Sequence, residues 1–299
     1  MKNILIIGCG LLGSSLLRRI SKNKLAKNIF VYEKSKKNII KIKRLKLPGI
    51  LVKQLQDAVT KSELIIFCTP MSEYKKIILK INNHLTRKHI ITDVGSSKFK
   101  SEEIITQNLK KNIFWTSSHP IAGSEVSGPE HGKYNLFENK WCILIKGKRS
   151  SKKQLKFLSS FWKKLGSKIA VMNPEKHDKI FSITSHLPHL IAYNLVKSAQ
   201  DFEKKQKYNL LKYSAGGLRD FSRIAASNEI MWRDIFFDNK DNVSKAINLF
   251  INNLKAFKRD IDSKNNKSIL KKLIQTKKVR SKIIKLKQDI DKPDFGRND

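Results

Sequence analysis

The stretch that decides the fold is Ile4-Leu-Ile-Ile-Gly-Cys-Gly-Leu-Leu-Gly13, close to the start of the 299-residue chain. An apolar run ends in the spacing Gly-x-Gly-x-x-Gly, and further apolar residues follow at helical spacing. This pattern predicts a strand, a tight turn and a helix start, the arrangement that holds the pyrophosphate of a dinucleotide. Gly8 permits the turn, Gly10 lets the backbone approach the phosphates, and Gly13 lets the helix pack closely on the strand. We expect the backbone N–H groups of Leu11 and Leu12, at the helix start, to contact the anion.

An acidic residue follows at the distance expected for a ribose contact. Glu33 lies 20 residues after Gly13, at the end of a second apolar run. An acid at this place binds the ribose hydroxyls and repels the 2′-phosphate of NADP, which favours NAD. Lys34 and Lys36 beside it could accommodate a 2′-phosphate, so NADP stays open as an alternative. Thr69, at the end of the apolar run Leu64–Thr69, is also expected to contact the cofactor.

The cysteines and the hydropathy pattern indicate a protein of the cytoplasm. Cys9, Cys68 and Cys142 form no Cys-x-x-Cys pair. An odd, scattered set in apolar runs is typical of free thiols in a reducing compartment. No stretch approaches the roughly 18 apolar residues that a membrane-spanning helix needs. We therefore expect a soluble, cytoplasmic protein without a membrane partner.

The charge of the chain leaves two interpretations open. The formal net charge is +37, a value that ordinarily suggests nucleic acid or an anionic membrane as a partner. The lysines are spread along the whole chain, commonly beside Ile and Asn, so a solvated lysine-rich surface fits as well, and we favour it. The densest stretch, residues 264–287, predicts a basic amphipathic helix. A positive field would attract an anionic substrate in either case.

The order of the apolar patterns predicts two domains. Strand-like runs alternate with amphipathic segments through residues 1–173, which predicts a Rossmann-type α/β domain with a doubly wound, mainly parallel sheet. The runs after the first are Ile29–Glu33, Ile50–Val52, Leu64–Thr69, Ile90–Val94, Ile113–Thr116, Trp141–Ile145 and Ile169–Met172. From Pro174 onward the strand pattern stops and helical periodicity continues. Residues 174–299 are therefore expected to form an all-helical domain.

Three polar segments occur where a Rossmann enzyme builds its site, at strand ends and on the facing domain. They are residues 92–98, 118–125 and 216–227, the last followed by Met-Trp-Arg-Asp at 231–234. His119 is the histidine at a strand end beside the expected cofactor. A neutral imidazole can accept a proton near neutral pH, so His119 is a candidate general base. The alternative is a turn histidine that is fixed by Pro120.

These motifs resemble the prephenate dehydrogenase family of the tyrosine pathway, whose members are also called cyclohexadienyl or arogenate dehydrogenases. The resemblance rests on Gly-x-Gly-Leu-x-Gly-x-Ser at residues 8–15, His-Pro-x-Ala-Gly at 119–123, Ser-His-Leu-Pro-His at 185–189 and Arg-Asp-x-x-Arg-Ile-Ala at 219–225. It implies a Rossmann domain followed by a helical domain through which a homodimer forms. It also implies NAD-dependent oxidative decarboxylation of prephenate (or arogenate) to 4-hydroxyphenylpyruvate (or tyrosine), with hydride transferred to NAD.

The resemblance implies a role for two residues in the reaction. His119 would take the proton of the substrate's ring hydroxyl as hydride departs. Ser96 would hydrogen-bond the histidine and the hydroxyl, and so orient both. A structural alternative for Ser96 is an N-cap of the helix that runs through Glu102 and Ile105, and the two roles are compatible.

The resemblance also implies substrate contacts. Arg223 would hold a carboxylate, for which guanidinium is a bidentate match. Arg219, one turn earlier, is either a second anion contact or a salt-bridge partner of a nearby aspartate. His189 would contact the substrate side chain, and Trp232 is either near the pocket or part of the core. His186 and His189 stand at i, i+3, but no further Cys or His ligands follow in a metal-binding pattern, so we expect no metal site.

Two other functions stay open on the sequence alone. One is a two-domain Rossmann dehydrogenase for a 3-hydroxy acid, which would use a lysine such as Lys176 or Lys179. The other is a basic protein that binds nucleic acid on a Rossmann scaffold, which we consider the less favoured partner class. Prephenate and arogenate differ by a keto or an amino group on the side chain, and His189 favours prephenate.

Overall fold

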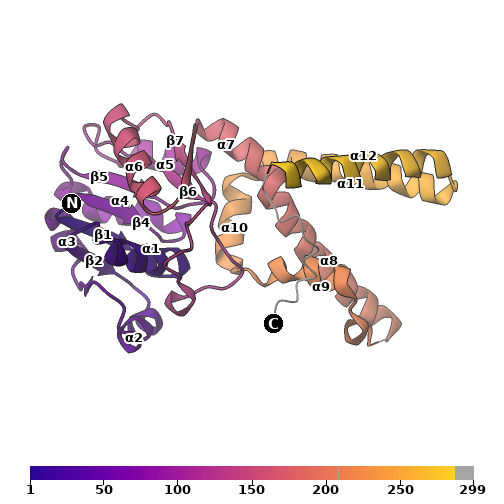
Figure 1. Cartoon of the computed structure of the whole chain (residues 1–299), viewed down its shortest axis with the longest axis horizontal. Coiled ribbons are helices and arrows are strands. Elements are labelled where there is room, and N and C mark those ends of the chain that lie inside the picture. Colours follow the sequence, from indigo (N-terminus) through magenta and orange to yellow (C-terminus); the bar gives the residue numbers. More distant parts are fainter. Residues whose placement is uncertain (208, 287–299) are drawn as a thin grey trace. The chain divides into compact units, whose positions relative to one another are not determined.

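The computed structural model of the chain describes residues 1–207 and 209–286, and it divides into two compact units (Figure 1). The first unit contains residues 1–186 and 226–240, and the second contains residues 187–225 and those from 241 onward. The last residue of the predicted basic helix, 287, and the end of the predicted C-terminal domain, 288–299, lie outside the described residues.

The first unit is built on parallel strands. The described strands are β1 (Asn3–Ile7), β2 (Asn28–Tyr32), β3 (Ile50–Leu51), β4 (Leu64–Phe67), β5 (Ile90–Asp93), β6 (Ser118–Pro120), β7 (Trp141–Ile145) and β8 (Lys168–Met172). The first five form one parallel sheet in the order β3-β2-β1-β4-β5, and the last three form a second sheet. The chain moves outward from β1 to β3 and then returns to β4 on the other side of β1. A ligand crevice is expected at this switch point, beyond the carboxyl ends of β1 and β4.

Continuous apolar runs form these strands because both faces of the sheet are covered. On one face, Ile4 and Ile6 of β1 join a core cluster with Leu16 and Leu17 of helix α1 (Leu11–Lys22). The same cluster includes residues of β7 and of helix α6 (Lys152–Lys164). On the other face, Phe67 of β4 packs edge-on against Tyr74, the first residue of helix α4 (Tyr74–Ile81). The doubly wound α/β prediction is confirmed.

One predicted strand is wrong. Within residues 113–116, Ile113, Trp115 and Thr116 are buried and Phe114 is exposed, but the segment forms no strand. Their backbone bonds go to separate partners: the N–H of Trp115 donates to Arg149 O, and that of Thr116 donates to Ile91 O. The strand begins two residues later at Ser118 and pairs antiparallel with β7, so the second sheet is mixed.

The remaining helices connect the strands and then replace them. They are α2 (Lys36–Arg44), α3 (Leu55–Lys61), α5 (Phe99–Asn108), α7 (Pro174–Phe181), α8 (Leu187–Gln206), α9 (Gly216–Arg223), α10 (Glu229–Asp238), α11 (Lys240–Asp262) and α12 (Asn266–Lys285). A π-helical turn, Ser182–His186, joins α7 to α8. In the second unit, α11 and α12 lie side by side as a hairpin (Figure 1), and Lys272 of α12 forms an ion pair with Asp260 of α11. From residue 174 to 286 the described chain is helical, as predicted.

A helix that crosses a lipid bilayer must be both long and apolar. Within residues 1–207 and 209–286, none of them combines the length and the apolar character needed to cross a membrane.

Candidate active site

The three glycines of the first turn occupy three different environments. Gly8 has a φ of +91°, in the left-handed region that favours glycine, and its N–H donates to Tyr32 O. A Cβ on Gly13 would overlap the carbonyl oxygen of Gly8, so only glycine lets the helix approach the strand. A Cβ on Gly10 would meet no heavy atom within 4 Å. The backbone at Gly10 therefore opens onto free space, as a phosphate contact requires.

Unsatisfied polar groups surround this turn. Helix α1 starts directly after Gly10, and the N–H groups of Leu11, Leu12 and Gly13 belong to its first turn, where no helical carbonyl precedes them. The Thr69 hydroxyl oxygen is buried and has no hydrogen-bond partner among the described residues. Its methyl carbon lies 3.0 Å from the place of a Cβ on Gly8, so the side chain adjoins the turn. These donors and this hydroxyl fit a dinucleotide phosphate.

Glu33 is held beside the same turn. Its Oε2 accepts the N–H of Cys9 at 2.8 Å, and its Oε1 accepts the N–H of Ser35 at 2.8 Å. Oε2 also accepts the side-chain N–H of Asn38 at 3.4 Å. Each carboxylate oxygen has two lone pairs, so Oε1 retains acceptor capacity for a ribose hydroxyl. The acid thus ends β2 next to the glycine turn that ends β1, where the sequence had predicted it.

His119 lies in β6 and is 8% exposed, and it begins a series of three side chains. Its Nδ1 is 2.8 Å from Nε2 of His177, a residue of α7. The Nδ1 of His177 is in turn 2.7 Å from Oδ1 of Asp178. Phe181 covers both imidazoles, with ring centroids 5.0 Å and 4.4 Å away. The His177 and Asp178 side chains have no exposed area.

Asp178 also holds the start of helix α5. Its Oδ1 accepts the N–H of Lys98 at 2.9 Å, and its Oδ2 accepts the N–H of Phe99 at 2.8 Å. The predicted capping role of Ser96 is therefore wrong: helix α5 begins at Phe99, and a carboxylate from α7 serves its N-terminus. Ser96 itself is half-buried in the loop between β5 and α5.

These contacts fix the tautomers of both histidines. Asp178 accepts two backbone N–H groups, so it acts as an acceptor and His177 donates from Nδ1. The Nε2 of His177 must then accept, and His119 donates from Nδ1. The lone pair of His119 is left on Nε2, and the described residues offer that nitrogen no hydrogen bond. His119 is therefore oriented to receive a proton at Nε2.

The electrostatics keep this histidine neutral. Burial is the largest cause that lowers the pKa of His119 well below its usual value, followed by the neighbouring His177 and then Lys98. Burial likewise lowers the pKa of His177. A neutral imidazole is the form that can act as a base.

The other residues predicted from the sequence fall into two groups. Trp232 belongs to α10 of the first unit, is 5% exposed and packs edge-on against His186, with ring centroids 6.1 Å apart. His189 belongs to α8, and Arg219 and Arg223 lie one turn apart on α9, all in the second unit. Both arginines are exposed and His189 is half-buried. Within that unit α8 and α9 pack against each other.

The sequence analysis missed His177 and Asp178. Both lie in the first turns of a helix that begins at Pro174, in a region predicted to be helical, but no local pattern connects them with His119. The available signal was a His-Asp pair in the first turns of a helix that begins with a proline. The described residues contain no cluster of three or more His, Cys, Asp or Glu side chains that could hold a metal ion.

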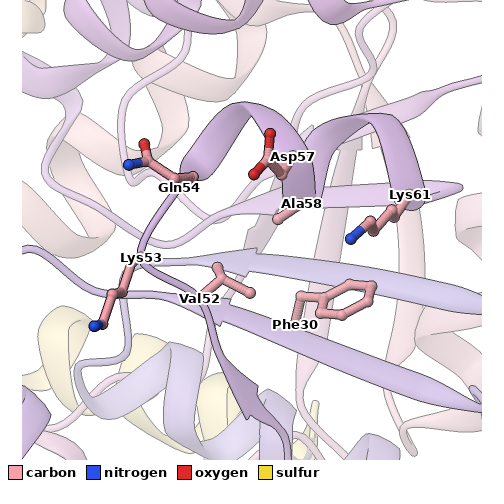
Figure 2. Close-up of a pocket in the computed structure, with 7 residues that line it drawn as sticks. All are labelled: Phe30, Val52, Lys53, Gln54, Asp57, Ala58 and Lys61. Carbon is pink, nitrogen blue, oxygen red and sulfur yellow. The ribbon is translucent and has the colours of Figure 1, made fainter.

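A cavity of about 260 Å³ lies elsewhere in the first unit, where α3 faces Phe30 and Val52 (Figure 2). The residues that line it are Phe30, Val52, Lys53, Gln54, Asp57, Ala58 and Lys61. None of them belongs to the glycine turn or to the histidine series, so the candidate active site is defined by the strand ends and not by this cavity.

Comparisons with known proteins point to one family. The family model of the prephenate dehydrogenase nucleotide-binding domain matches residues 16–171, and that of the prephenate dehydrogenase dimerization domain matches residues 173–276. The chain is 32% identical to the cyclohexadienyl dehydrogenase of Zymomonas mobilis over 290 residues, which cover 97% of this chain and 98% of that one. It is 31% identical to the prephenate dehydrogenase of Bacillus subtilis over 271 residues, which cover 90% and 72%.

A solved structure agrees with these matches. The crystal structure of prephenate dehydrogenase from Aquifex aeolicus, in complex with hydroxyphenyl propionate and NAD+, superposes with a TM-score of 0.87 at 33% identity. The match covers 95% of this chain and 98% of that one. The resemblance inferred from the motifs is thus confirmed, and the chain is an oxidoreductase with a nucleotide-binding domain. It belongs to the prephenate dehydrogenase family.

Proposed function

We propose that the chain catalyses the NAD-dependent oxidative decarboxylation of prephenate, with arogenate as the alternative substrate, and that His119 is the general base. His119 Nε2 takes the proton of the ring hydroxyl while the hydrogen on the same carbon leaves as hydride. Bound NAD+ supplies the hydride acceptor. The bond to the ring carboxylate then breaks and CO2 departs. His119 returns its proton to the phenolate oxygen, so no net proton is taken up.

The observation that carries this proposal is the series His119–His177–Asp178. Asp178 is fixed by two backbone N–H groups, and it orients His177, which orients His119. The series would direct the lone pair at Nε2 of His119 toward the substrate. The Nε2 of His177 accepts the Nδ1–H of His119 and would stabilise the ring when it becomes charged. A positioned base of this kind typically contributes about 10²- to 10⁴-fold in rate.

The cofactor site is proposed at the switch point of the sheet. The N–H groups of Leu11, Leu12 and Gly13 would hold the pyrophosphate, which Gly8 and Gly10 allow to approach. Glu33 would accept the ribose hydroxyls, and the Thr69 hydroxyl would supply a further polar contact. The carboxylate of Glu33 supports NAD over NADP, because a 2′-phosphate would meet its negative charge.

The substrate contacts are proposed from the family resemblance. Arg223 would pair with a carboxylate and Arg219 would add a second positive charge. His189 would contact the keto side chain of prephenate, Trp232 would line the pocket, and Ser96 would orient the hydroxyl. Residues 1–173 would act as the dinucleotide-binding domain and residues 174–299 as the substrate and dimerisation domain of a cytoplasmic homodimer.

The test is NADH formation from prephenate and from arogenate, each with NAD and with NADP. We expect turnover with prephenate and NAD. His119→Asn should lower kcat by about 10²- to 10⁴-fold with little change in the KM for prephenate. His131→Asn, an exposed histidine outside the site, is the matched control and should keep the wild-type kcat. Near-native turnover of His119→Asn would contradict the role of the base. Folded protein without turnover on any substrate pair would contradict the reaction.

A further inference from the structure

A lysine whose side chain has no exposed area lies behind the histidine series. The Nζ of Lys98 is 2.6 Å from Oδ2 of Asp93, and neither side chain of this ion pair reaches solvent. The same Nζ donates to the carbonyl oxygen of Ser118 at 2.8 Å. Removing two charges from water costs several kcal/mol, and a buried ion pair often stabilises a fold no more than apolar side chains would. A buried pair at this place therefore calls for a role besides stability.

The contacts of Lys98 lead to both ends of the histidine series. Ser118, whose carbonyl it holds, directly precedes His119 in β6. The backbone N–H of Lys98 donates to Oδ1 of Asp178 at 2.9 Å, at the other end. One residue thus connects the strand that carries the base with the carboxylate that orients it.

The partner of Lys98 is itself fixed from several sides. Oδ2 of Asp93 accepts the hydroxyl of Tyr74 at 3.0 Å and the N–H of Gly95 at 3.0 Å. Its Oδ1 accepts the indole N–H of Trp115 at 3.2 Å. Asp93 ends β5, so Lys98 joins His119 to the rigid edge of the parallel sheet.

We propose that Lys98 is a positioning residue for the reaction, which holds Ser118 against Asp93 and thereby fixes the ring of His119 with respect to Asp178. This inference rests on the proposed function, because it concerns the base of that reaction. A displacement of the ring by about 1 Å would cost roughly 10²-fold in rate even though Lys98 touches no substrate.

The positive charge of Lys98 provides a second measurement, the pH dependence of kcat, that is independent of the loss in rate. The groups that face His119 or Lys98 are His177 and Asp178 of α7, His186 of the π-helical turn, Asp93 of β5, Tyr74 of α4, Glu102 of α5 and Cys142 of β7. After burial and His177, the positive charge of Lys98 is the next cause that lowers the pKa of His119. Removing that charge should raise the pKa of the base.

The experiment compares full-length enzymes with Lys98→Met, Lys98→Met combined with Asp93→Asn, and His119→Asn. Lys100→Met, an exposed lysine two residues along, is the matched control. We expect both Lys98 variants to lose about 10- to 100-fold in kcat with less than about threefold change in the KM for prephenate and for NAD. The acid limb of the kcat profile should move to higher pH in Lys98→Met, which removes only the positive charge. The double variant removes one charge of each sign and therefore tests kcat alone. The double variant should regain the thermal midpoint, because it leaves no unpaired buried carboxylate.

The outcomes separate this inference from the proposed function. A double variant with wild-type kcat would show that the ion pair is only structural and would overturn the inference, as would a folded Lys98→Met variant with wild-type kcat and an unmoved acid limb. This double variant decides the matter even where Lys98→Met alone does not fold. Near-native kcat in His119→Asn would overturn the proposed function instead. Loss of kcat in His119→Asn together with unchanged Lys98 variants would leave the base in place and reject Lys98.

Discussion

The carboxylate of Asp178 lies across the N-terminus of α5, where its Oδ2 accepts the N–H of Phe99 at 2.8 Å. Its Oδ1 accepts the N–H of Lys98 and the ring N–H of His177. A single side chain therefore caps one helix and orients the imidazole behind the base. Asp178 is therefore the common anchor of the start of helix α5 and, through His177, of the ring of His119.

Asp178→Asn should damage catalysis more than folding. An amide keeps one acceptor oxygen: at the Oδ1 position it would still accept the N–H groups of Lys98 and His177, but its NH2 group would face the N–H of Phe99. Reversing the amide relieves Phe99 and turns the NH2 group toward Lys98 and His177 instead. His177 then loses its fixed tautomer, and we expect kcat to fall by about 10²- to 10⁴-fold. Steady-state kinetics with prephenate measure the change, and Asp57→Asn, an exposed aspartate, serves as the control. A kcat within twofold of wild type would refute the coupling of Asp178 to the base.

Gly10 and Gly13 should respond differently to the same substitution. Gly13→Ala places a Cβ against the carbonyl of Gly8, and such overpacking costs about 1–3 kcal/mol. Gly10→Ala meets no atom of the protein, so its thermal midpoint should equal that of wild type. Its NAD affinity should fall at least about 10-fold, or about 1.4 kcal/mol, because the methyl group occupies the approach of the phosphates. Thermal unfolding without cofactor and calorimetric NAD titration measure both. Wild-type NAD affinity in Gly10→Ala would place the pyrophosphate elsewhere.

Glu33→Gln should weaken the preference for NAD over NADP. The amide oxygen can still accept the N–H of Cys9, so the turn keeps its shape. The negative charge that opposes a 2′-phosphate is gone, and Lys34 beside it remains. We expect the ratio of kcat/KM for NADP to that for NAD to rise about 10-fold, a change of about 1.4 kcal/mol. Glu103→Gln on the surface of α5 should leave the ratio unchanged. An unchanged ratio in Glu33→Gln would remove Glu33 from cofactor selection.

The parts of the fold that follow local rules could be predicted from the sequence. A parallel strand buried on both faces must be apolar throughout, and the close packing behind Gly13 excludes any side chain. Residues 4–13 are therefore enough to predict β1, its turn and the start of α1. Residues 113–116 satisfy the same apolar rule yet form no strand. Ile113 and Trp115 are apolar because they are buried, although Phe114 between them is exposed. The backbone hydrogen bonds of the segment go to Arg149 and Ile91, which no local pattern identifies.

The same distinction holds at the candidate site. His119 was found because it follows an apolar run closely and precedes a proline, which is a local signal. His177 is 58 residues away, and the hydrogen bond between the two rings exists only in the folded chain. An N-cap of α5 was the structural alternative for Ser96 because serine is a good N-cap, but Asp178 reaches the helix start from α7 and takes that place. In a lysine-rich chain, no local pattern distinguishes Lys98 from a surface lysine, and only its tertiary contacts show that it is buried.

The buried carboxyl group of Glu102 gives a prediction about protein stability that needs no activity measurement. This residue of α5 is 6% exposed, and its Oε1 accepts the hydroxyl of Ser117 at 3.2 Å. Gly147 packs so closely on the carboxyl group that a Cβ there would overlap it. Burial is the main cause that raises the pKa of Glu102 from 4.5 to about 7, and the negative charge of Asp93 adds to it.

The stability of the protein should therefore fall as pH rises through the pKa of Glu102. The folded state binds this proton more tightly than the unfolded state, so the contribution is complete below about pH 4.5 and is lost as pH passes about 7. The loss amounts to at most about 3 kcal/mol. Glu102→Gln, which mimics the neutral acid, should match the wild type at about pH 4.5 and exceed its urea midpoint at about pH 8. Glu103→Gln, at an exposed neighbour, should show no such pH dependence. An equal difference between Glu102→Gln and wild type at both pH values would mean that folding does not raise the pKa of Glu102.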